Sequence, residues 1–354
     1  MGLLEETIQK INPASAEGRR LARERIATLT MPYWALGRVL DLAESLAGMA
    51  GGLSFSVSRK TVVVMAGDHG VCAEGVSKYP KDVTPQMVAN FIQGGAGVNA
   101  IAKVSGARVV VVDMGVDADL APMAEDGKLI IKKIRRGTSN IATGPAMSRE
   151  EAVASIEAGI EVARSLAGST DVFGTGDMGI GNTTPSSAIV SAITGRKPSE
   201  ITGRGTGIDD SQLRHKVSVV ERALAVNRPD PADGVDVLAK VGGFEIGGIA
   251  GLILGAASMR KPVVIDGFIS TAGALIAKAI KKESSDYMIA AHLSVEPGHR
   301  AMLEHLGAKA HLDLDMRLGE GSGAALAMCI VEAAQRVLTE MATFDSAGVS
   351  QSDE

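Results

Sequence analysis

The stretch TVVVMAGDHG, residues 61–70, decides the fold, because a short β-branched run leads directly into glycine and polar residues. A second stretch, RVVVVDMG at 108–115, has the same form. Continuous apolar strands that alternate with helical patterns are typical of a parallel sheet covered on both faces. We therefore expect an α/β fold, with a Rossmann-like parallel sheet and helices on both of its faces.

Weaker strands are predicted further along the chain, with helical periodicity between them. The strands are expected at 128–134, 171–173, 263–265 and 287–290, and the main helices at 149–166, 211–225, 246–258, 271–282 and 322–341. Most of the strands end in glycine plus a polar residue or in a polar cluster. Because ligands of open α/β sheets bind beyond the carboxyl ends of the strands, these ends predict one shared site.

The two ends of the chain predict a second, smaller unit. Residues 1–50 show helical spacing without a strand, and the tail after the last long helix loses its pattern and is expected to fray. We expect residues 1–55 and 322–354 to form a small helical domain. Residues 56–321 then form the large α/β catalytic domain.

Composition and charge exclude several classes of protein. The net charge is −5 over 354 residues, so a nucleic-acid partner is not expected. Two cysteines, Cys72 and Cys329, give neither a disulfide framework nor zinc spacing. No apolar run approaches the roughly 20 residues of a membrane span, and the N-terminus lacks a signal-peptide pattern. We expect a cytoplasmic protein that binds small molecules.

Metal binding is not expected either. Asp68 and His69 could act as an acid–base pair or as metal ligands, but no further histidine or carboxylate cluster has ligand spacing.

The segment Gly174–Gly179 is a literal G-x-G-x-x-G after a predicted strand, which suggests an NAD-dependent oxidoreductase. Two features disfavour that interpretation. The loop continues to Asn182, so the helix is expected to start only at Thr183 or Thr184, and Glu200, near the right spacing, lies in a cap or turn. An anion site of free N–H groups remains, with a tight turn that binds nothing as the structural alternative.

A second glycine loop, Gly203–Gly207, also leads into a predicted helix. Lys216 follows it at a distance from which its side chain could reach back to a phosphate. Alone, this lysine would be interpreted as a solvated charge. After two glycine loops, it is predicted to be a phosphate ligand.

Glu320 has a glycine on either side in MRLGEGSG, residues 316–323. One interpretation is an acid that favours the helix dipole or caps a helix. The other is a general base in a water-poor pocket, with its pKa raised by partial burial. The local sequence does not decide between the two.

Together these segments strongly resemble the nicotinate-nucleotide–dimethylbenzimidazole phosphoribosyltransferase family. The resemblance covers nearly the whole chain. It rests on MAGDHGVCAEGVS (65–77), MGIGNTTPSSA (178–188), DGVDVLAKVGGFEIGGIAG (233–251), VVIDGF (263–268), AHLSVEPGH (291–299) and MRLGEGSGAALAM (316–328).

The resemblance implies a reaction in the synthesis of the lower ligand of cobalamin. Nicotinate mononucleotide would donate phosphoribose to 5,6-dimethylbenzimidazole, giving α-ribazole 5′-phosphate and nicotinate. Glu320 would be the catalytic base, no cofactor or metal would be needed, and the chain would form a homodimer. A nucleotide-binding module without catalytic activity is the remaining alternative.

The resemblance also assigns binding residues. Positions matched to the nucleotide and its phosphate are Gly179, Asn182, Thr183, Gly205, Lys216, Asp266 and Ser294, and positions matched to the benzimidazole pocket are Ser77, Asp177 and Leu318. Asp177 departs from the family pattern, which has glutamate there, so its role is open. The preferred base is open too, because apolar contacts discriminate neighbouring ring shapes by only about 1–3 kcal/mol.

Overall fold

A computed structural model of the chain describes residues 2–124 and 128–350. In these residues the strands form one sheet with the order β3-β2-β1-β4-β5-β6, and all of its pairings are parallel. The strands are β1 (Lys60–Gly67), β2 (Arg108–Gly115), β3 (Leu129–Ile131), β4 (Val172–Met178), β5 (Val263–Ile265) and β6 (Met288–Ala290). The order reverses between β1 and β4, which is the switch point of a doubly wound sheet. The predicted fold class is confirmed.

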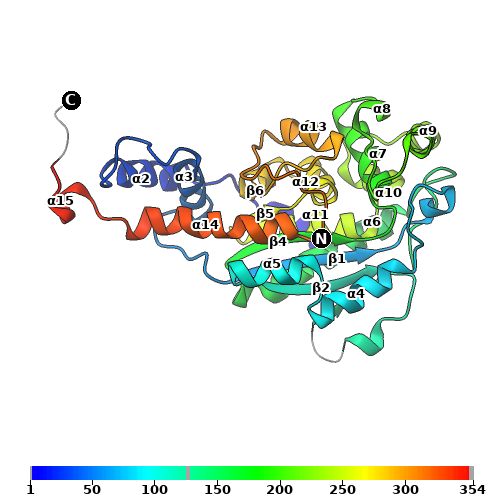
Figure 1. The fold of residues 1–354 in the computed structure, drawn as a ribbon, viewed down its shortest axis with the longest axis horizontal. Helices are drawn as coiled ribbons and strands as arrows, with labels where there is room; N and C mark the ends of the chain where they lie inside the picture. The colour runs from blue at the N-terminus through cyan, green and yellow to red at the C-terminus, as the bar shows by residue number, and fades with distance from the viewer. Residues whose placement is uncertain (1, 125–127, 351–354) are drawn as a thin grey trace.

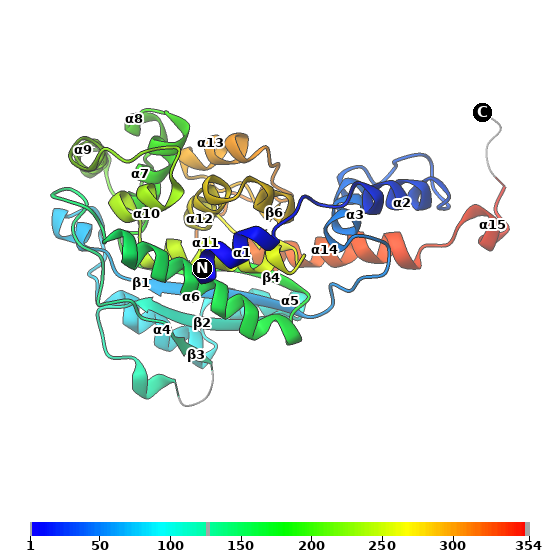
Figure 2. The same ribbon diagram turned by 180° about the vertical axis from the view of Figure 1, so that it is seen from behind.

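Helices cover both faces of the sheet (Figures 1 and 2). Helices α4 (Val83–Gln93), α5 (Gly97–Ser105) and α14 (Ser322–Glu340) pack on one face, and α11 (Phe244–Ser258) and α12 (Phe268–Ile280) pack on the other, with α6 (Arg149–Leu166) against α11. Every residue of β1 is buried, because it lies centrally between the two layers. This explains why its sequence is a continuous apolar run rather than an alternating one.

Further helices surround the carboxyl edge of the sheet (Figure 1). They are α7 (Thr183–Thr194), α8 (Pro198–Ile201), α9 (Asp210–Asn227), α10 (Gly234–Val241) and α13 (Pro297–Leu306), and short 3₁₀ turns occupy Gly70–Glu74, Ala121–Met123, Ala167–Ser169 and Lys282–Tyr287.

Strand β4 is longer than the sequence predicts. It continues to Met178, so Gly174 and Gly176 lie within the strand, and the prediction of a glycine-rich loop that begins at Gly174 was wrong. A Cβ on Gly176 would lie 2.4 Å from the carbonyl oxygen of Glu320. This glycine therefore lets another segment approach the strand closely. The predicted helix start at Thr183 is confirmed.

The ends of the chain lie in two places. Helices α2 (Ala16–Ala27) and α3 (Arg38–Ala50) pack together and contact the part of α14 that projects beyond the sheet (Figure 1). Helix α1 (Leu3–Lys10) instead packs on α6, where the backbone N–H of Leu4 donates to Oε1 of Glu157 at 2.9 Å (Figure 2). The division into domains 1–55 with 322–354 and 56–321 stays a prediction.

The C-terminal tail does not lose its structure after α14. A short helix, α15 (Phe344–Ala347), follows, and Thr343 caps it by accepting from the backbone N–H of Ser346. The backbone N–H of Thr30 donates to the carbonyl of Ala342 at 3.1 Å and ties the tail to the N-terminal helices. The prediction that this segment frays was wrong as far as residue 347, and residues 351–354 lie outside the described residues.

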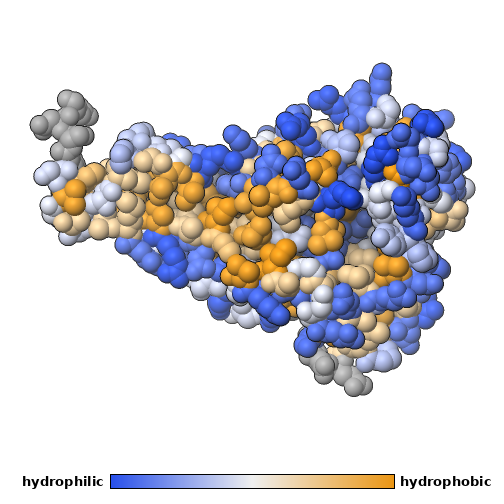
Figure 3. Space-filling model, in the orientation of Figure 1, coloured by the Kyte–Doolittle hydropathy of each residue, from blue (hydrophilic) through white to orange (hydrophobic). Residues whose placement is uncertain are grey.

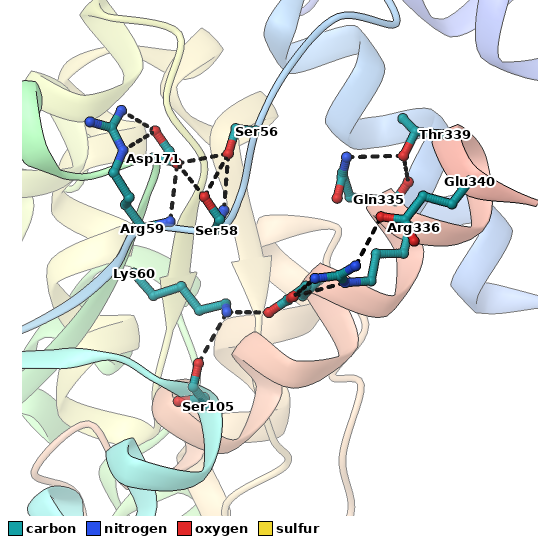
Figure 4. A network of polar contacts seen from close by, with 11 residues as sticks. Ser56, Ser58, Arg59, Lys60, Ser105, Asp171, Gln335, Arg336, Thr339 and Glu340 are labelled. Atoms are coloured by element: carbon teal, nitrogen blue, oxygen red, sulfur yellow. Dashed lines mark hydrogen bonds and ion pairs between the residues drawn. The ribbon is translucent and has the colours of Figure 1, made fainter.

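A polar network holds α14 against the sheet (Figure 4). The buried Lys60, at the start of β1, donates to the carbonyl of Ser105 at 3.0 Å and forms an ion pair with Glu332 of α14. Arg59 next to it pairs with Asp171, which precedes β4. These contacts join β1, α5, α14 and β4 at the amino edge of the sheet, opposite the edge where ligands are expected.

Over the described ranges, no helix combines the length and the apolar character that crossing a membrane requires.

Candidate active site

The Glu320 loop lies in front of β4 and leads into α14. Three successive residues have left-handed backbone angles: Gly319 (φ +79°), Glu320 (φ +64°) and Gly321 (φ +91°). Glycine adopts this conformation freely, whereas a glutamate does so only at a cost in free energy. Contacts with the surrounding structure therefore hold the backbone of Glu320 in a conformation that is unfavourable for a glutamate in isolation.

Asp266, directly after β5, supports this loop. Its carboxylate accepts from the backbone N–H of Gly321 at 3.1 Å and of Ala324 at 2.9 Å, and so caps α14. The imidazole Nε2 of His292 lies 3.8 Å from the same carboxylate. Both carboxylate oxygens are thus engaged with the loop and the helix start.

The carboxylate of Glu320 is buried, with 7% of the residue exposed. Its Oε2 accepts from the backbone N–H of Val98 at 3.1 Å, in the first turn of α5. Burial raises the pKa of Glu320, and the charge of Asp266 adds to the rise, while the Val98 N–H opposes it. Glu320 therefore meets a helix N-terminus, that of α5, and is also a buried acid with a raised pKa, while its role as a general base stays a prediction.

Asp177, near the end of β4, is a second buried acid beside this loop. Its Oδ2 accepts from the side-chain amide of Asn182 at 3.0 Å, and its Oδ1 has no hydrogen-bond partner among the described residues. Burial raises the pKa of Asp177 well above its usual value, and the charges of Asp266 and Glu245 raise it further. This acid with a raised pKa lies close to the Glu320 loop, since a Cβ on Gly319 would be 3.2 Å from Oδ2 of Asp177.

Lys216, on α9, reaches back toward the start of α7, as predicted. Its Nζ donates to Oγ1 of Thr183 at 2.6 Å, and only 1% of the residue is exposed. Burial lowers the pKa of Lys216 to about 8, although the charge of Glu296 opposes this shift. Gly205 lies directly over the ammonium group, because a Cβ on it would be 3.2 Å from Nζ.

The start of α7 joins the two groups of residues. Asn182 contacts the carboxylate of Asp177, and the next residue, Thr183, contacts Lys216. Gly179, in the turn before them, packs on β1, since a Cβ there would lie 2.2 Å from the carbonyl oxygen of Gly67. The structure therefore links Asp177, one of the residues assigned to the base, to residues that the resemblance assigns to the nucleotide.

Ser294 follows β6 and is fixed through its backbone. Its N–H donates to Nδ1 of His299 at 2.9 Å, and Nε2 of the same ring lies 2.9 Å from Oγ1 of Thr271. Burial lowers the pKa of His299 to about 3, so the imidazole is neutral and accepts at Nδ1.

The two other residues assigned to the benzimidazole pocket are not neighbours in one cavity. Ser77 lines a cavity of about 640 Å³ formed by residues 68–70, 72, 73, 77–81, 117 and 136–138. Leu318 is not part of that lining in the described chain; it is 58% exposed and lies over Gly97.

Sequence reasoning missed two acids. Nε2 of His69 lies 2.8 Å from Oε1 of the fully buried Glu245, so this histidine pairs with an acid of α11 rather than with Asp68. Burial opposes protonation of His69, but the charge of Glu245, its hydrogen bond and the charge of Asp68 together outweigh burial, so the pKa of His69 is raised. The signal was an acid inside the apolar run FEIGGIAGLILG. The second missed acid, Glu296, gave no comparable signal.

The described part of the chain contains no group of three or more His, Cys, Asp or Glu residues that could hold a metal ion.

Comparisons with known proteins agree with this geometry. A family model described as a phosphoribosyltransferase matches residues 11–349. Nicotinate-nucleotide–dimethylbenzimidazole phosphoribosyltransferases of Syntrophotalea carbinolica and Desulfotalea psychrophila are 60% and 54% identical over 351 residues, which cover 99% of each chain. The crystal structure of the enzyme of that name from Thermus thermophilus superimposes with a TM-score of 0.90 at 45% identity, covering 96% of this chain and 100% of that one.

Fold and site together define an enzyme of the phosphoribosyltransferase class, built on a doubly wound sheet. Within that class, the chain belongs to the nicotinate-nucleotide–dimethylbenzimidazole phosphoribosyltransferase family. The rival interpretation, an NAD-dependent oxidoreductase, loses its basis because Gly174 and Gly176 lie inside β4.

Proposed function

We propose that the chain transfers phosphoribose from nicotinate mononucleotide to 5,6-dimethylbenzimidazole, with Glu320 as the base. The observation that carries this proposal is the buried carboxylate of Glu320, held in left-handed backbone with a raised pKa. A base whose pKa lies closer to neutrality shares a proton with its substrate more effectively than an exposed carboxylate does.

In the proposed reaction, one ring nitrogen of the acceptor attacks C1′ of the ribose while the other loses its proton to Glu320. The new N–C1′ bond forms on the face opposite the leaving group, so a β-riboside becomes an α-riboside. The old C1′–N bond breaks, and its electron pair neutralises the pyridinium nitrogen of nicotinate. Because the leaving group departs as a neutral ring nitrogen, no acid catalyst is needed there.

The nucleotide is proposed to bind around the start of α7. Lys216 supplies a positive charge, Gly205 a backbone N–H, and Thr183 a hydroxyl, and all three are in mutual contact. Helix N-termini also favour anions, and Thr183 is the first residue of a 12-residue helix. The other residues proposed for this site are Gly179, Asn182, Asp266 and Ser294.

The acceptor ring is proposed to approach Glu320 from the side of Ser77, Asp177 and Leu318. Support comes from Asp177 and Leu318, which lie at the Glu320 loop, whereas Ser77 is included on the family resemblance alone and lines a separate cavity. A protonated Asp177 could donate a hydrogen bond to an acceptor atom of a ring. The shorter acid thus retains a polar group where the family pattern has glutamate.

The test is product formation. Purified protein with nicotinate mononucleotide and 5,6-dimethylbenzimidazole should yield equal amounts of nicotinate and α-ribazole 5′-phosphate, measured by liquid chromatography with mass spectrometry. If the protein binds the nucleotide but forms no product, the result would favour a nucleotide-binding module without catalytic activity. Saturable binding of NAD with hydride transfer to a substrate would instead favour the oxidoreductase.

We also propose a homodimer. Figure 3 shows apolar side chains gathered along α14 and the adjoining α5, where Val104 is 74% exposed and Ile101, Ile330 and Val337 are partly buried. An exposed apolar band of this kind is typical of an interaction surface. Light scattering should then give twice the chain mass of 36.4 kDa, and Val104→Glu should lower it.

A cytoplasmic location is proposed from the cysteines. Cys72 and Cys329 are both free in the structure, and unpaired thiols are usual in reducing compartments.

A further inference from the structure

Glu296 places a carboxylate inside the proposed nucleotide site. This residue precedes α13 and is 8% exposed. Its Oε1 accepts from the backbone N–H of Gly205 at 3.1 Å, and its Oε2 is buried without a hydrogen-bond partner among the described residues. The N–H that is proposed to bind phosphate is therefore already bound to an anionic group of the protein.

The loop around Gly205 closes over both partners. A Cβ on Gly203 would lie 1.8 Å from Oε2 of Glu296, and a Cβ on Gly205 would lie 2.9 Å from Oγ1 of Thr183. The glycines thus let the backbone lie against the carboxylate on one side and against the Lys216 cluster on the other. Lys216 itself is buried and has no ion pair within 4.0 Å in the described chain.

We propose that Glu296 is a stand-in for the substrate's phosphate, which holds the Gly205 N–H in the free enzyme and is displaced when the nucleotide binds. This inference rests on the proposed function, because it takes Gly205 and Lys216 as ligands of the nucleotide. One N–H makes one strong hydrogen bond, so carboxylate and phosphate compete for it. Two anions beside one lysine also repel each other.

Two further observations agree with this role. The first is electrostatic: burial lowers the pKa of Lys216, and the charge of Glu296 opposes this shift, so the carboxylate acts on the lysine. The guanidinium of Arg317 donates to the carbonyl of Gly205 at 3.1 Å, so the same loop is held from both sides while the carboxylate is in place. Glu296 therefore sets how tightly a phosphorylated ligand binds, and it does not affect a ligand without phosphate.

The experiment compares Glu296→Gln with the wild type by calorimetry, with nicotinate mononucleotide and inorganic phosphate as separate probes. Chloride buffer at pH 6.5 avoids competing phosphate and keeps Lys216 charged. Loss of the competing charge should lower both dissociation constants by about tenfold, while the affinity for nicotinate riboside stays constant. The matched control is Glu304→Gln, the same change at an exposed position of α13, which should leave all three constants unchanged.

An unchanged or higher dissociation constant in Glu296→Gln would overturn the inference, and a higher one would indicate that the carboxylate binds the nucleotide directly. A crystal structure of the wild type with the nucleotide needs no variant: Oε1 of Glu296 must have left the N–H of Gly205. If it remains there beside a bound phosphate, the inference is wrong. Failure of the wild type to bind nucleotide or form product would instead contradict the proposed function.

Discussion

Asn182 donates its side-chain Nδ2 to Oδ2 of Asp177 over 3.0 Å, and so links the first turn of α7 to the end of β4. The next residue, Thr183, accepts from Lys216. A shift at the start of α7 therefore displaces the contacts of both the Asp177 carboxylate and the Lys216 ammonium group. This link gives a physical route by which nucleotide binding could position the groups around the acceptor base.

The first prediction concerns the protonation of Asp177. Its folded pKa is raised well above the usual 3.8, mainly by burial. In the wild type, the raised pKa of Asp177 therefore makes its full contribution to stability below about pH 4. This contribution is lost as the pH rises through the folded pKa, because the folded protein must then hold a buried carboxylate. Asn at this position keeps the contact with Asn182 and does not ionise, so Asp177→Asn should gain stability relative to wild type as pH rises.

Urea unfolding of Asp177→Asn and wild type at pH 5 and pH 8 measures this difference. The stability that Asp177→Asn gains over the wild type should be larger at pH 8 than at pH 5. The increase should be about 1.4 kcal/mol for each pH unit between pH 5 and the folded pKa of Asp177. A difference that stays constant between the two pH values would show that Asp177 is ionised in the folded protein.

The second prediction is the effect of Glu320→Gln on turnover. General-base catalysis contributes about 10²–10⁴ in rate, so kcat should fall by at least about 100-fold. Nucleotide affinity should remain, because Glu320 contacts the N–H of Val98 and none of the residues around Lys216. Steady-state kinetics with separate nucleotide titrations test both statements, and near-full activity would remove Glu320 as the base.

The pH profile of the wild type adds a check on Glu320. Its pKa is raised by burial above the usual 4.5, and the base must be deprotonated to act. Activity should therefore fall with decreasing pH at a midpoint above 4.5. A midpoint at or below 4.5 would contradict the burial that the structure shows.

Much of this site follows from the sequence, for a definite reason. Glu320 and Asp177 stand next to glycines, and Asp177 lies near the end of a strand, so local signals place both side chains at the carboxyl edge of a sheet. Lys216 lies inside α9, and only the two glycine loops that precede it point to its role. Glu245 and Glu296 act through partners more than 90 residues away, His69 and Gly205. The acid inside the apolar run FEIGGIAGLILG marks Glu245 itself, but no local pattern reports either contact.

The error at Gly174–Gly179 has a similar origin. Glycine disfavours strands in isolation, so the sequence predicts a loop after Phe173. In the fold, a Cβ on Gly174 would lie 2.8 Å from Cε of Met328, and one on Gly176 would clash with the Glu320 loop. Packing of α14 and its preceding loop on β4 therefore requires glycine within the strand, and tertiary contacts override the local preference.

The third prediction concerns Lys216 and pH. Burial lowers its pKa to about 8, so the ammonium is lost as pH rises through 8. The KM for nicotinate mononucleotide should therefore rise between pH 7 and pH 9 in the wild type. Lys216→Met should raise the KM at pH 7 by about 10- to 100-fold, the value of a charged hydrogen bond. Its KM should then vary little with pH, and a parallel rise in both proteins would place the titrating group elsewhere.

The fourth prediction is structural and concerns the amino edge of the sheet. Glu332 is the ion-pair partner of Lys60, whose side chain is only 4% exposed. Glu332→Ala leaves that buried charge with the Ser105 carbonyl alone, so the free energy of unfolding should fall by about 1–3 kcal/mol, the cost of a buried donor that loses its partner. Glu340→Ala removes an exposed partner of Arg336 on the same helix and should change it by less than about 0.5 kcal/mol. If the two variants lose the same free energy of unfolding, the ion pair with the buried Lys60 contributes no more to stability than an exposed ion pair does.

The last prediction separates the position of Glu320 from its chemistry. In Gly176→Ala the new Cβ would lie 2.4 Å from the carbonyl oxygen of Glu320, so the Glu320 loop must move away from β4. Overpacking of this kind costs about 1–3 kcal/mol of stability. We expect kcat to fall while nucleotide affinity changes little, because Gly176 is separate from the contacts around Lys216. In Gly168→Ala the new Cβ has no neighbour within 4 Å, so this control should match the wild type in both kinetics and unfolding. If Gly176→Ala keeps full kcat despite its loss of stability, then turnover does not depend on the left-handed position that the loop gives to Glu320.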